Sequence, residues 1–218
     1  MVGLDNSSKS FPRVCDRFPG GEPSFDYLGC HLPMTAKTFV CIASGPSLNA
    51  HDCELVRQSG LPTIAVNNSW QLAPWCDHIY AGDLAWWDSY GSQAPTTCQR
   101  WSCTRQAVAK HGLNWHEAYG EYNSGLRAIE LSFKLGAERV LLLGYDCTVQ
   151  GGTHWHGDHA DTKNPDEALC RKWNAQHARL PQRDKVVNCS RETALECYRL
   201  GHLEKELQKV VDTCDVRD

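Results

Sequence analysis

The sequence contains no apolar run near the roughly 20 residues that a helix needs to span a membrane. Residues 1–9 are polar and lack the apolar stretch of a secretory signal. Basic residues are not in excess, because 22 Lys and Arg against 26 Asp and Glu give a formal net charge of -4. This balance provides no overall field to attract a polyanion. We therefore expect a cytoplasmic protein without a membrane span, and the charge does not indicate a nucleic-acid partner.

Twelve cysteines are present, but no two of them form a C-x-x-C pair, so the usual spacing of a zinc knuckle is missing. Disulfide frameworks occur mainly in short secreted chains. Several of these cysteines lie in or beside apparent core segments. We expect buried, reduced thiols.

The chain divides into an N-terminal arm and one larger domain. Residues 1–37 are rich in Gly, Pro and Ser and have no hydrophobic period, which predicts an irregular arm. A chain of 218 residues with 41% hydrophobic content is long enough for one full α/β core. We therefore assign residues 38–218 to a single domain.

Short apolar runs alternate with helical patterns along this domain. Such alternation is typical of a mostly parallel sheet that helices cover on both faces. Pro165 suits the first turn of its predicted helix. The predicted strands are 39–43, 62–66, 77–81, 139–143 and 185–188, and the predicted helices are 49–59, 124–135, 165–180 and amphipathic segments up to 211.

The turn Ser44-Gly45-Pro46-Ser47 follows the first predicted strand. In open parallel sheets, ligands bind outside the carboxyl ends of the strands, where glycine permits close backbone approach and helix N-termini offer free N–H groups to anions. Gly45 and Ser47 would offer backbone and hydroxyl groups, while Pro46 fixes φ. The turn therefore predicts a phosphate cradle, with an ordinary β–α turn as the alternative.

Other polar residues stand at the ends of predicted strands or the start of a helix. Amides suit base and ribose edges because they both donate and accept hydrogen bonds. Their joint position predicts a nucleotide site, although each could instead cap a helix or loop. Four tryptophans around the second and third strands favour core packing, with stacking of Trp86 or Trp87 on a base or sugar as the alternative. The polar residues are Asn67, Asn68, Asp83, Asn123, Ser124 and Asp146.

The densest polar cluster is His154-Trp155-His156-Gly157-Asp158-His159, after the most apolar strand. Histidine suits both acid–base catalysis near neutral pH and metal ligation, and the pattern does not choose between them. The spelling H-x-H-x-D-H resembles the zinc motif of the metallo-β-lactamase-like hydrolases. In that family further ligands follow on later loops, whereas the segment after His159 is mainly helical in pattern. A dizinc hydrolase is kept as an alternative.

The order of several motifs resembles that of the small bacterial CMP-sialic-acid-dependent sialyltransferases and of 6-hydroxymethylpterin diphosphokinase-like proteins. The resemblance runs from about Phe39 to Leu207, and similar proteins also occur in bacteriophage genomes, which would imply the host cytoplasm. It implies a Rossmann-like nucleotide-binding transferase. The matching segments are Ala43-Ser44-Gly45-Pro46-Ser47-Leu48, Val66-Asn67-Asn68, Tyr122-Asn123-Ser124-Gly125, Leu143-Gly144-Tyr145-Asp146 and Val187-Asn188-Cys189.

The resemblance also implies roles for individual residues. It implies that Gly45, Pro46 and Ser47 face the nucleotide phosphates, that Asn67 or Asn68 faces the nucleoside, and that Ser124-Gly125 faces the nucleotide from another side. His159, before a helix, falls nearest the catalytic base of the sialyltransferases, where it would deprotonate an acceptor hydroxyl.

The chain also departs from the sialyltransferase pattern. Thr148 and His154 stand where that family places two tyrosines on the leaving phosphate, so CMP-sialate is not carried over as the donor. No D-x-D occurs, although Asp83, Asp146 and Asp158 could hold Mg²⁺.

We therefore expect a nucleotide-dependent transferase, a glycosyltransferase that uses a nucleotide-sugar donor and a hydroxyl acceptor. His159 would be the general base, with His154 or His156 on the leaving phosphate. The alternatives are Mg²⁺-dependent diphosphoryl transfer from ATP, a non-catalytic nucleotide-binding phage protein, and the dizinc hydrolase. The identity of the acceptor and the formation of a homo-oligomer stay open.

Overall fold

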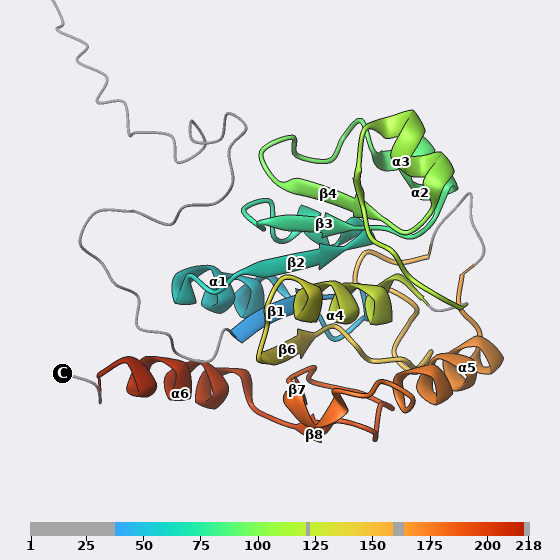
Figure 1. The fold of residues 1–218 in the computed structure, drawn as a ribbon. Helices are drawn as coiled ribbons and strands as arrows, with labels where there is room; N and C mark the ends of the chain where they lie inside the picture. Colours follow the sequence, from blue (N-terminus) through green and yellow to red (C-terminus); the bar gives the residue numbers. More distant parts are fainter. Residues whose placement is uncertain (1–37, 121–122, 159–163, 216–218) are drawn as a thin grey trace, which may run out of the picture. The chain divides into compact units, whose positions relative to one another are not determined.

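Eight strands form one parallel sheet in the computed structural model (Figure 1). The structure describes residues 38–120, 123–158 and 164–215, with the helix backbone alone after residue 210, so the predicted arm 1–37 lies outside the described residues. The strands are β1 Thr38–Ile42, β2 Thr63–Val66, β3 His78–Tyr80, β4 Gln99–Ser102, β5 Asn114–Trp115, β6 Arg139–Leu143, β7 Val186–Asn188 and β8 Arg199–Leu200.

Six α-helices and two short 3-10 helices connect these strands. Asn49 and Asn123 begin α1 and α4 by accepting a hydrogen bond from the backbone N–H three residues on, as expected of N-cap residues. The α-helices are α1 Ala50–Ser59, α2 Leu84–Tyr90, α3 Arg105–His111, α4 Ser124–Lys134, α5 Glu167–His177 and α6 Leu203–Asp215, and the 3-10 helices are η1 Asn67–Gln71 and η2 Arg183–Lys185.

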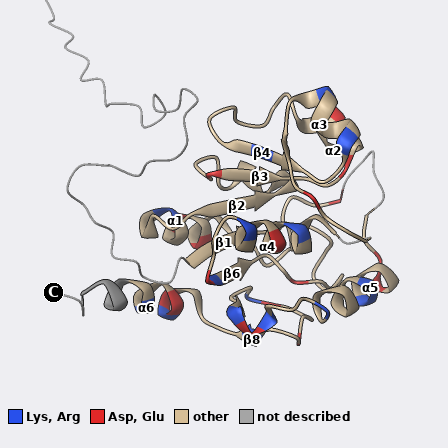
Figure 2. Cartoon of the chain, in the orientation of Figure 1, with Lys and Arg blue, Asp and Glu red and all other residues tan. Residues whose placement is uncertain are grey.

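The core has two layers because successive side chains of a strand point to opposite faces of the sheet. In β1, Val40 and Ile42 join a cluster that includes side chains of α1, α2, α3 and α6. Phe39 and Cys41 join a second cluster with the apolar side of α4, which lies across the central strands (Figure 1). Strands β1, β2 and β3 carry no charged residue, and most charges lie on helices and loops (Figure 2).

The strand order is β5-β4-β3-β2-β1-β6-β7-β8, with every neighbouring pair parallel. The chain winds outward from β1 to β5, returns through α4, and continues from β6 on the other side of β1. This is a Rossmann-like arrangement, and its strand order reverses between β1 and β6. The carboxyl ends of those two strands are where such sheets bind ligands.

The predicted parallel α/β sheet is confirmed, including all five predicted strands. Helix α5 begins at Glu167 after the N-cap Asp166, so Pro165 precedes the helix rather than occupying its first turn. Sequence reasoning missed β5 and β8 because two residues have no measurable period, and β4 because its segment QRWS is polar. It also missed α2 and α3, which have seven residues each.

Within the described part of the chain, no helix is both long and apolar enough to cross a membrane.

Candidate functional site

A cavity of about 600 Å³ opens at the carboxyl edge of the sheet, where the strand order reverses. Its walls come from the turns after β1, β2, β3, β4 and β6, from the first residues of α4, and from one side of α5. Of the predicted site residues, it is lined by Gly45, Asn67, Asp83, Asn123, Ser124, Gly125, Asp146, Thr148 and His154. The lining does not include Pro46, Ser47, Asn68, His156 or Asp158 among the described residues.

The turn after β1 is closed by hydrogen bonds within the protein. Gly45 N–H donates to the Gly144 carbonyl at 2.8 Å. Ser47 donates from both its backbone N–H and its hydroxyl to Asp146, at 2.7 Å each. The predicted role of Ser47 as a phosphate donor therefore differs from its observed one, because a buried carboxylate takes both donors. The turn is chiefly a link between the ends of β1 and β6.

Asp146 is 1% exposed, and its two carboxylate oxygens both accept from Ser47. Burial raises the pKa of Asp146, while the two hydrogen bonds from Ser47 oppose that shift. Asp83 is exposed at the start of α2, and Asp158 is exposed and accepts a hydrogen bond from Thr153 at 2.5 Å. The three predicted magnesium ligands thus do not gather: of the residues that the structure describes, no three His, Cys, Asp or Glu side chains form a metal-binding group.

Asn67 and Asn68, adjacent in sequence, have different environments. Asn68 is 5% exposed, and its amide oxygen accepts from the indole N–H of Trp86 at 2.8 Å, so it is part of the core rather than a nucleoside contact. Asn67 lines the cavity with a left-handed backbone at φ 50°. Its Oδ1 is buried and accepts no hydrogen bond from any described residue. Such strain beside an unused acceptor is typical of ligand contacts.

The N-terminus of α4 faces the same cavity. Asn123 Oδ1 accepts from Leu126 N–H at 2.7 Å, and Ser124 Oγ accepts from Gly82 N–H at 3.0 Å. The N–H groups of Ser124 and Gly125 have no acceptor within the helix, because the first turn of any α-helix leaves its donors unpaired. Together with the helix dipole, they favour an anion. This terminus is a better phosphate site than the turn after β1.

Arg127 fixes the segment before α4, which sequence reasoning did not anticipate. Its side chain is 3% exposed and forms an ion pair with Glu130 at 2.6 Å. The guanidinium also donates to the backbone carbonyls of Tyr119 and Gly120, at 2.5 and 2.7 Å. Because Glu130 offsets the charge of Arg127, the main role of this arginine is to hold the segment before α4 in place.

The loop after β6, which carries His154 and His156, reaches the cavity through His154. Its Nδ1 lies 3.1 Å from Ser44 Oγ, and the backbone N–H of Trp155 donates to the Ser44 carbonyl. The rings of His154 and His156 stack at 5.1 Å with an angle of 11°, so their in-plane nitrogen lone pairs run side by side rather than converge. His159, the predicted base, lies outside the described residues. The described part of the loop thus holds His154 on the turn after β1.

Helix α5 supplies a wall that sequence reasoning missed. Residues 169, 173, 176 and 177 are spaced so that they lie on one side of α5, and this side lines the cavity. The spacing is visible in the sequence, but the sequence does not show that this side of the helix covers a cavity. His177 is 1% exposed, and burial lowers its pKa to about 4. Its Nδ1 lies 2.8 Å from the Tyr198 hydroxyl. The wall thus contains a neutral histidine.

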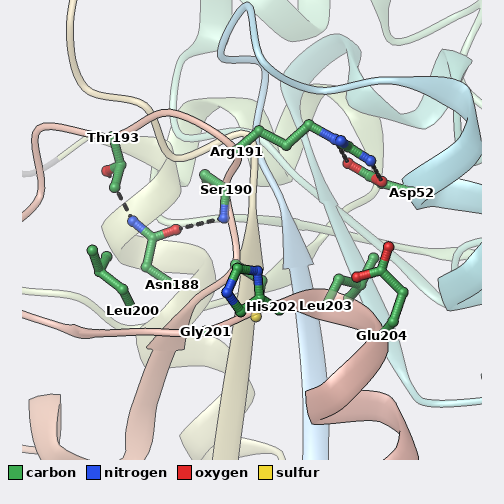
Figure 3. Close-up of a pocket in the computed structure, with 11 residues that line it drawn as sticks. Asp52, Asn188, Ser190, Arg191, Thr193, Leu200, Gly201, His202, Leu203 and Glu204 are labelled. Carbon is green, nitrogen blue, oxygen red and sulfur yellow. Dashed lines mark hydrogen bonds and ion pairs between the residues drawn. The ribbon is translucent and has the colours of Figure 1, made fainter.

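A second cavity, of about 540 Å³, lies beyond the carboxyl ends of β7 and β8 (Figure 3). Arg191 forms two hydrogen bonds with Asp52 at 2.6 and 2.8 Å, and the Asn188 amide bonds Ser190 and Thr193. These groups satisfy one another, so this cavity has less to offer a ligand. The predicted Val187-Asn188-Cys189 segment leads here rather than to the main cavity.

Trp86 and Trp87 belong to the core. They are 8% and 0% exposed, and their indole N–H groups bond Asn68 and the Ala81 carbonyl. Stacking of either ring on a ligand is therefore ruled out in this arrangement.

No protein-family model, no curated protein and no solved structure matches this chain.

Proposed function

We propose that this protein is a nucleotide-dependent transferase that moves a glycosyl group from a nucleotide sugar to a hydroxyl acceptor. The supporting observation is that the α4 N-terminus and Asn67, whose Oδ1 accepts no hydrogen bond from any described residue, line one cavity where the strand order reverses. An anion site beside an amide side chain with unused hydrogen-bonding capacity matches the two ends of a nucleotide. A cavity of about 600 Å³ falls in the usual range for small-molecule sites.

In this proposal the phosphates lie at the N–H groups of Ser124 and Gly125, and the nucleoside lies toward Asn67. His154, which Ser44 Oγ contacts, takes the position beside the leaving phosphate. As an imidazolium it would neutralise charge that develops on that phosphate. By resemblance, His159 is the base that deprotonates the acceptor hydroxyl. In the alternative reaction, diphosphoryl transfer from ATP, Asp83 would bind Mg²⁺.

A thermal-shift screen tests the proposal, with UDP-, GDP- and CMP-sugars, ATP and free nucleotides, each with and without Mg²⁺. A ligand at 100 times its Kd stabilises the native state by about 2.7 kcal/mol, which raises the melting temperature clearly. If no nucleotide changes the melting temperature, the proposal is wrong. Stabilisation by ATP and Mg²⁺ alone would favour diphosphoryl transfer, and binding without turnover of any donor would favour a non-catalytic binder.

A matched pair of variants tests the phosphate position. Ser124→Pro removes the backbone N–H, and proline is tolerated at the first helical position. Asn123 already has the extended backbone (φ -73°, ψ 162°) that a residue before proline prefers. Ser124→Ala removes the same hydroxyl but keeps the N–H. We expect Ser124→Pro alone to lose nucleotide affinity, and equal losses in both variants would contradict the role of the helix terminus.

His202→Ala serves as the control at the second cavity, where His202 is exposed. It should leave nucleotide binding unchanged. A loss of binding in His202→Ala would move the site to the cavity of Figure 3.

His159→Ala and His154→Ala, assayed for turnover with the donor that binds, separate the base from the phosphate contact. His159→Ala should abolish turnover and leave binding intact.

A further inference from the structure

The two sides of the main cavity differ in charge. The α4 side carries the helix N-terminus and the Arg127 guanidinium, which is paired with Glu130, and the exposed Asp83 also lies on the cavity wall. The α5 side carries one charged residue among those that the structure describes, the exposed Lys172. The remaining α5 residues of this wall are uncharged, and they are Leu169, Cys170, Trp173, Gln176 and His177. A phosphate and an uncharged group would therefore be separated between the two sides.

His177 has a defined hydrogen-bonding role on this wall. Its ring packs edge-on against Tyr145 and Tyr198, and its Nδ1 is 2.8 Å from the Tyr198 hydroxyl. With Nδ1 engaged, Nε2 is the polar atom of this ring that is left to the cavity. Burial lowers the pKa of His177 to about 4 and raises that of Tyr198, so both groups are neutral near pH 7.

The direction of this hydrogen bond follows from the burial of Tyr198, which is 4% exposed. Its hydroxyl has no other hydrogen-bond partner among the described residues. If Tyr198 accepted from His177, its own O–H would be left buried and unpaired, which is costly. The favourable arrangement has Tyr198 donating to Nδ1, and the single proton of the neutral imidazole then lies on Nε2. His177 thus offers an uncharged donor to the cavity.

Trp173 adds an aromatic surface one helical turn before His177. Its indole lines the cavity, is half-buried, and makes no ring contact with another aromatic side chain of the described segments. An aromatic surface beside uncharged hydrogen-bonding groups suits a hydroxyl-bearing ring, because the ring's C–H groups contact the apolar surface and its hydroxyls take the polar groups.

We propose that the α5 wall binds the neutral sugar of the donor, with His177 Nε2–H donating to a sugar oxygen and Trp173 covering the sugar ring. This inference rests on the proposed function and adds the class of sugar. A neutral hexose, as in UDP-glucose or GDP-mannose, fits this wall, where Lys172 is the one charged residue among those that the structure describes and would be the sole partner for the carboxylate of CMP-N-acetylneuraminate.

Calorimetric titration of matched ligands tests it: UDP against UDP-glucose, GDP against GDP-mannose, and CMP against CMP-N-acetylneuraminate. The neutral sugars should add affinity over their bare nucleotides, and the acidic sugar should add none.

His177→Phe keeps an aromatic ring but loses the donor, and it should lose roughly 10-fold in affinity for the neutral nucleotide sugar. Its affinity for the bare nucleotide should not change. Trp173→Ala should act in the same way, and His177→Gln, which keeps an N–H near the Nε2 position, should retain most of the gain.

Outcomes separate this inference from the proposed function. If the protein binds no nucleotide, both the proposed function and this inference are wrong. If it binds nucleotides but a neutral sugar adds no affinity, only the inference about the α5 wall is wrong. Equal losses for nucleotide and nucleotide sugar in His177→Phe would also overturn it. A measurement without ligand adds an independent check: ¹⁵N NMR should show His177 with its proton on Nε2, and Tyr198→Phe should disturb that preference. A proton on Nδ1 in the wild type would contradict the inference.

Discussion

Asp146 and Ser47, 99 residues apart in sequence, are joined by two hydrogen bonds of 2.7 Å to the two carboxylate oxygens. The pair connects the turn after β1 to the turn after β6, the two strands between which the sheet order reverses. The residues that sequence reasoning selected as a phosphate cradle thus hold the floor of the cavity in place. The N–H groups of Ser124 and Gly125, at the start of α4, are available to an anion.

Gly45→Ala should destabilise the protein strongly. An added Cβ would lie 2.5 Å from Asp146 Cγ and 2.6 Å from the Gly144 carbonyl oxygen, so the link between the two turns would have to shift. We expect a loss of about 2–4 kcal/mol in the free energy of unfolding, by analogy with overpacking in cores. Gly82→Ala is the control, because its Cβ would find the nearest atom at 3.4 Å. Urea unfolding of both variants checks this, and similar small losses would contradict the packing argument.

Variants of the two adjacent asparagines should separate binding from stability. Asn67→Gly removes the amide but allows the left-handed backbone, so nucleotide affinity should fall while stability changes little. Asn68→Ala leaves the buried Trp86 N–H without its acceptor and should cost about 1–3 kcal/mol of stability. Affinity and unfolding measured on each variant provide the test. The reverse pattern would place Asn68, not Asn67, at the ligand.

The pH dependence of stability should include a contribution from His116. It is 3% exposed, its Nδ1 lies 3.1 Å from the Tyr80 hydroxyl, and burial first, then Lys134 and Arg127, lowers its pKa to about 4. The unfolded chain binds the proton with a pKa near 6.5, so this histidine's contribution is complete above about pH 6.5 and is lost as the pH falls toward 4. The contribution is on the order of 3 kcal/mol.

Unfolding titrations between pH 4.5 and 7 measure this slope in the wild type and in His116→Asn, which keeps a polar group near the Nδ1 position. The variant should be less stable at pH 7 but show a flatter decline toward acid pH. A His116→Asn slope equal to that of the wild type would show that folding does not lower the pKa of His116.

The buried carboxylate of Glu206, on α6, should contribute strongly to stability. Its side chain is 3% exposed and pairs with Arg139, with Arg199 at 3.1 Å and with Lys209 at 2.9 Å. Glu206→Gln leaves three cations around a neutral amide, and we expect a loss of about 2–4 kcal/mol in unfolding free energy. Glu167→Gln breaks an exposed pair with Arg171 at 3.5 Å and should change stability by less than about 0.5 kcal/mol. Equal effects would mean that burial does not strengthen the Glu206 network.

Local patterns determined much of the fold. Strands β1 and β6 have five residues each, of which the last four are apolar and buried, and such continuous apolar strands predicted a parallel sheet. Asn49 and Asn123 stand directly before α1 and α4 and cap them, which is a local relationship because a cap bonds the backbone N–H three residues on. The two-residue strands β5 and β8 carry no such signal, because they are strands only through pairing with β4 and β7.

The candidate site was determined only in part by the sequence. Polar residues at strand ends indicated the correct edge of the sheet, since parallel strands bring their carboxyl ends together. Contacts between distant segments determined which of these residues face a ligand. Ser47 donates to Asp146, the Trp86 indole donates to Asn68, and α5 brings His177 beside Tyr198. Hydrogen bonds between residues many positions apart leave no local pattern in a single sequence. The tertiary structure alone therefore decided that the start of α4 offers unpaired N–H groups to the cavity and that α5 contributes a wall whose residues, apart from Lys172, are uncharged.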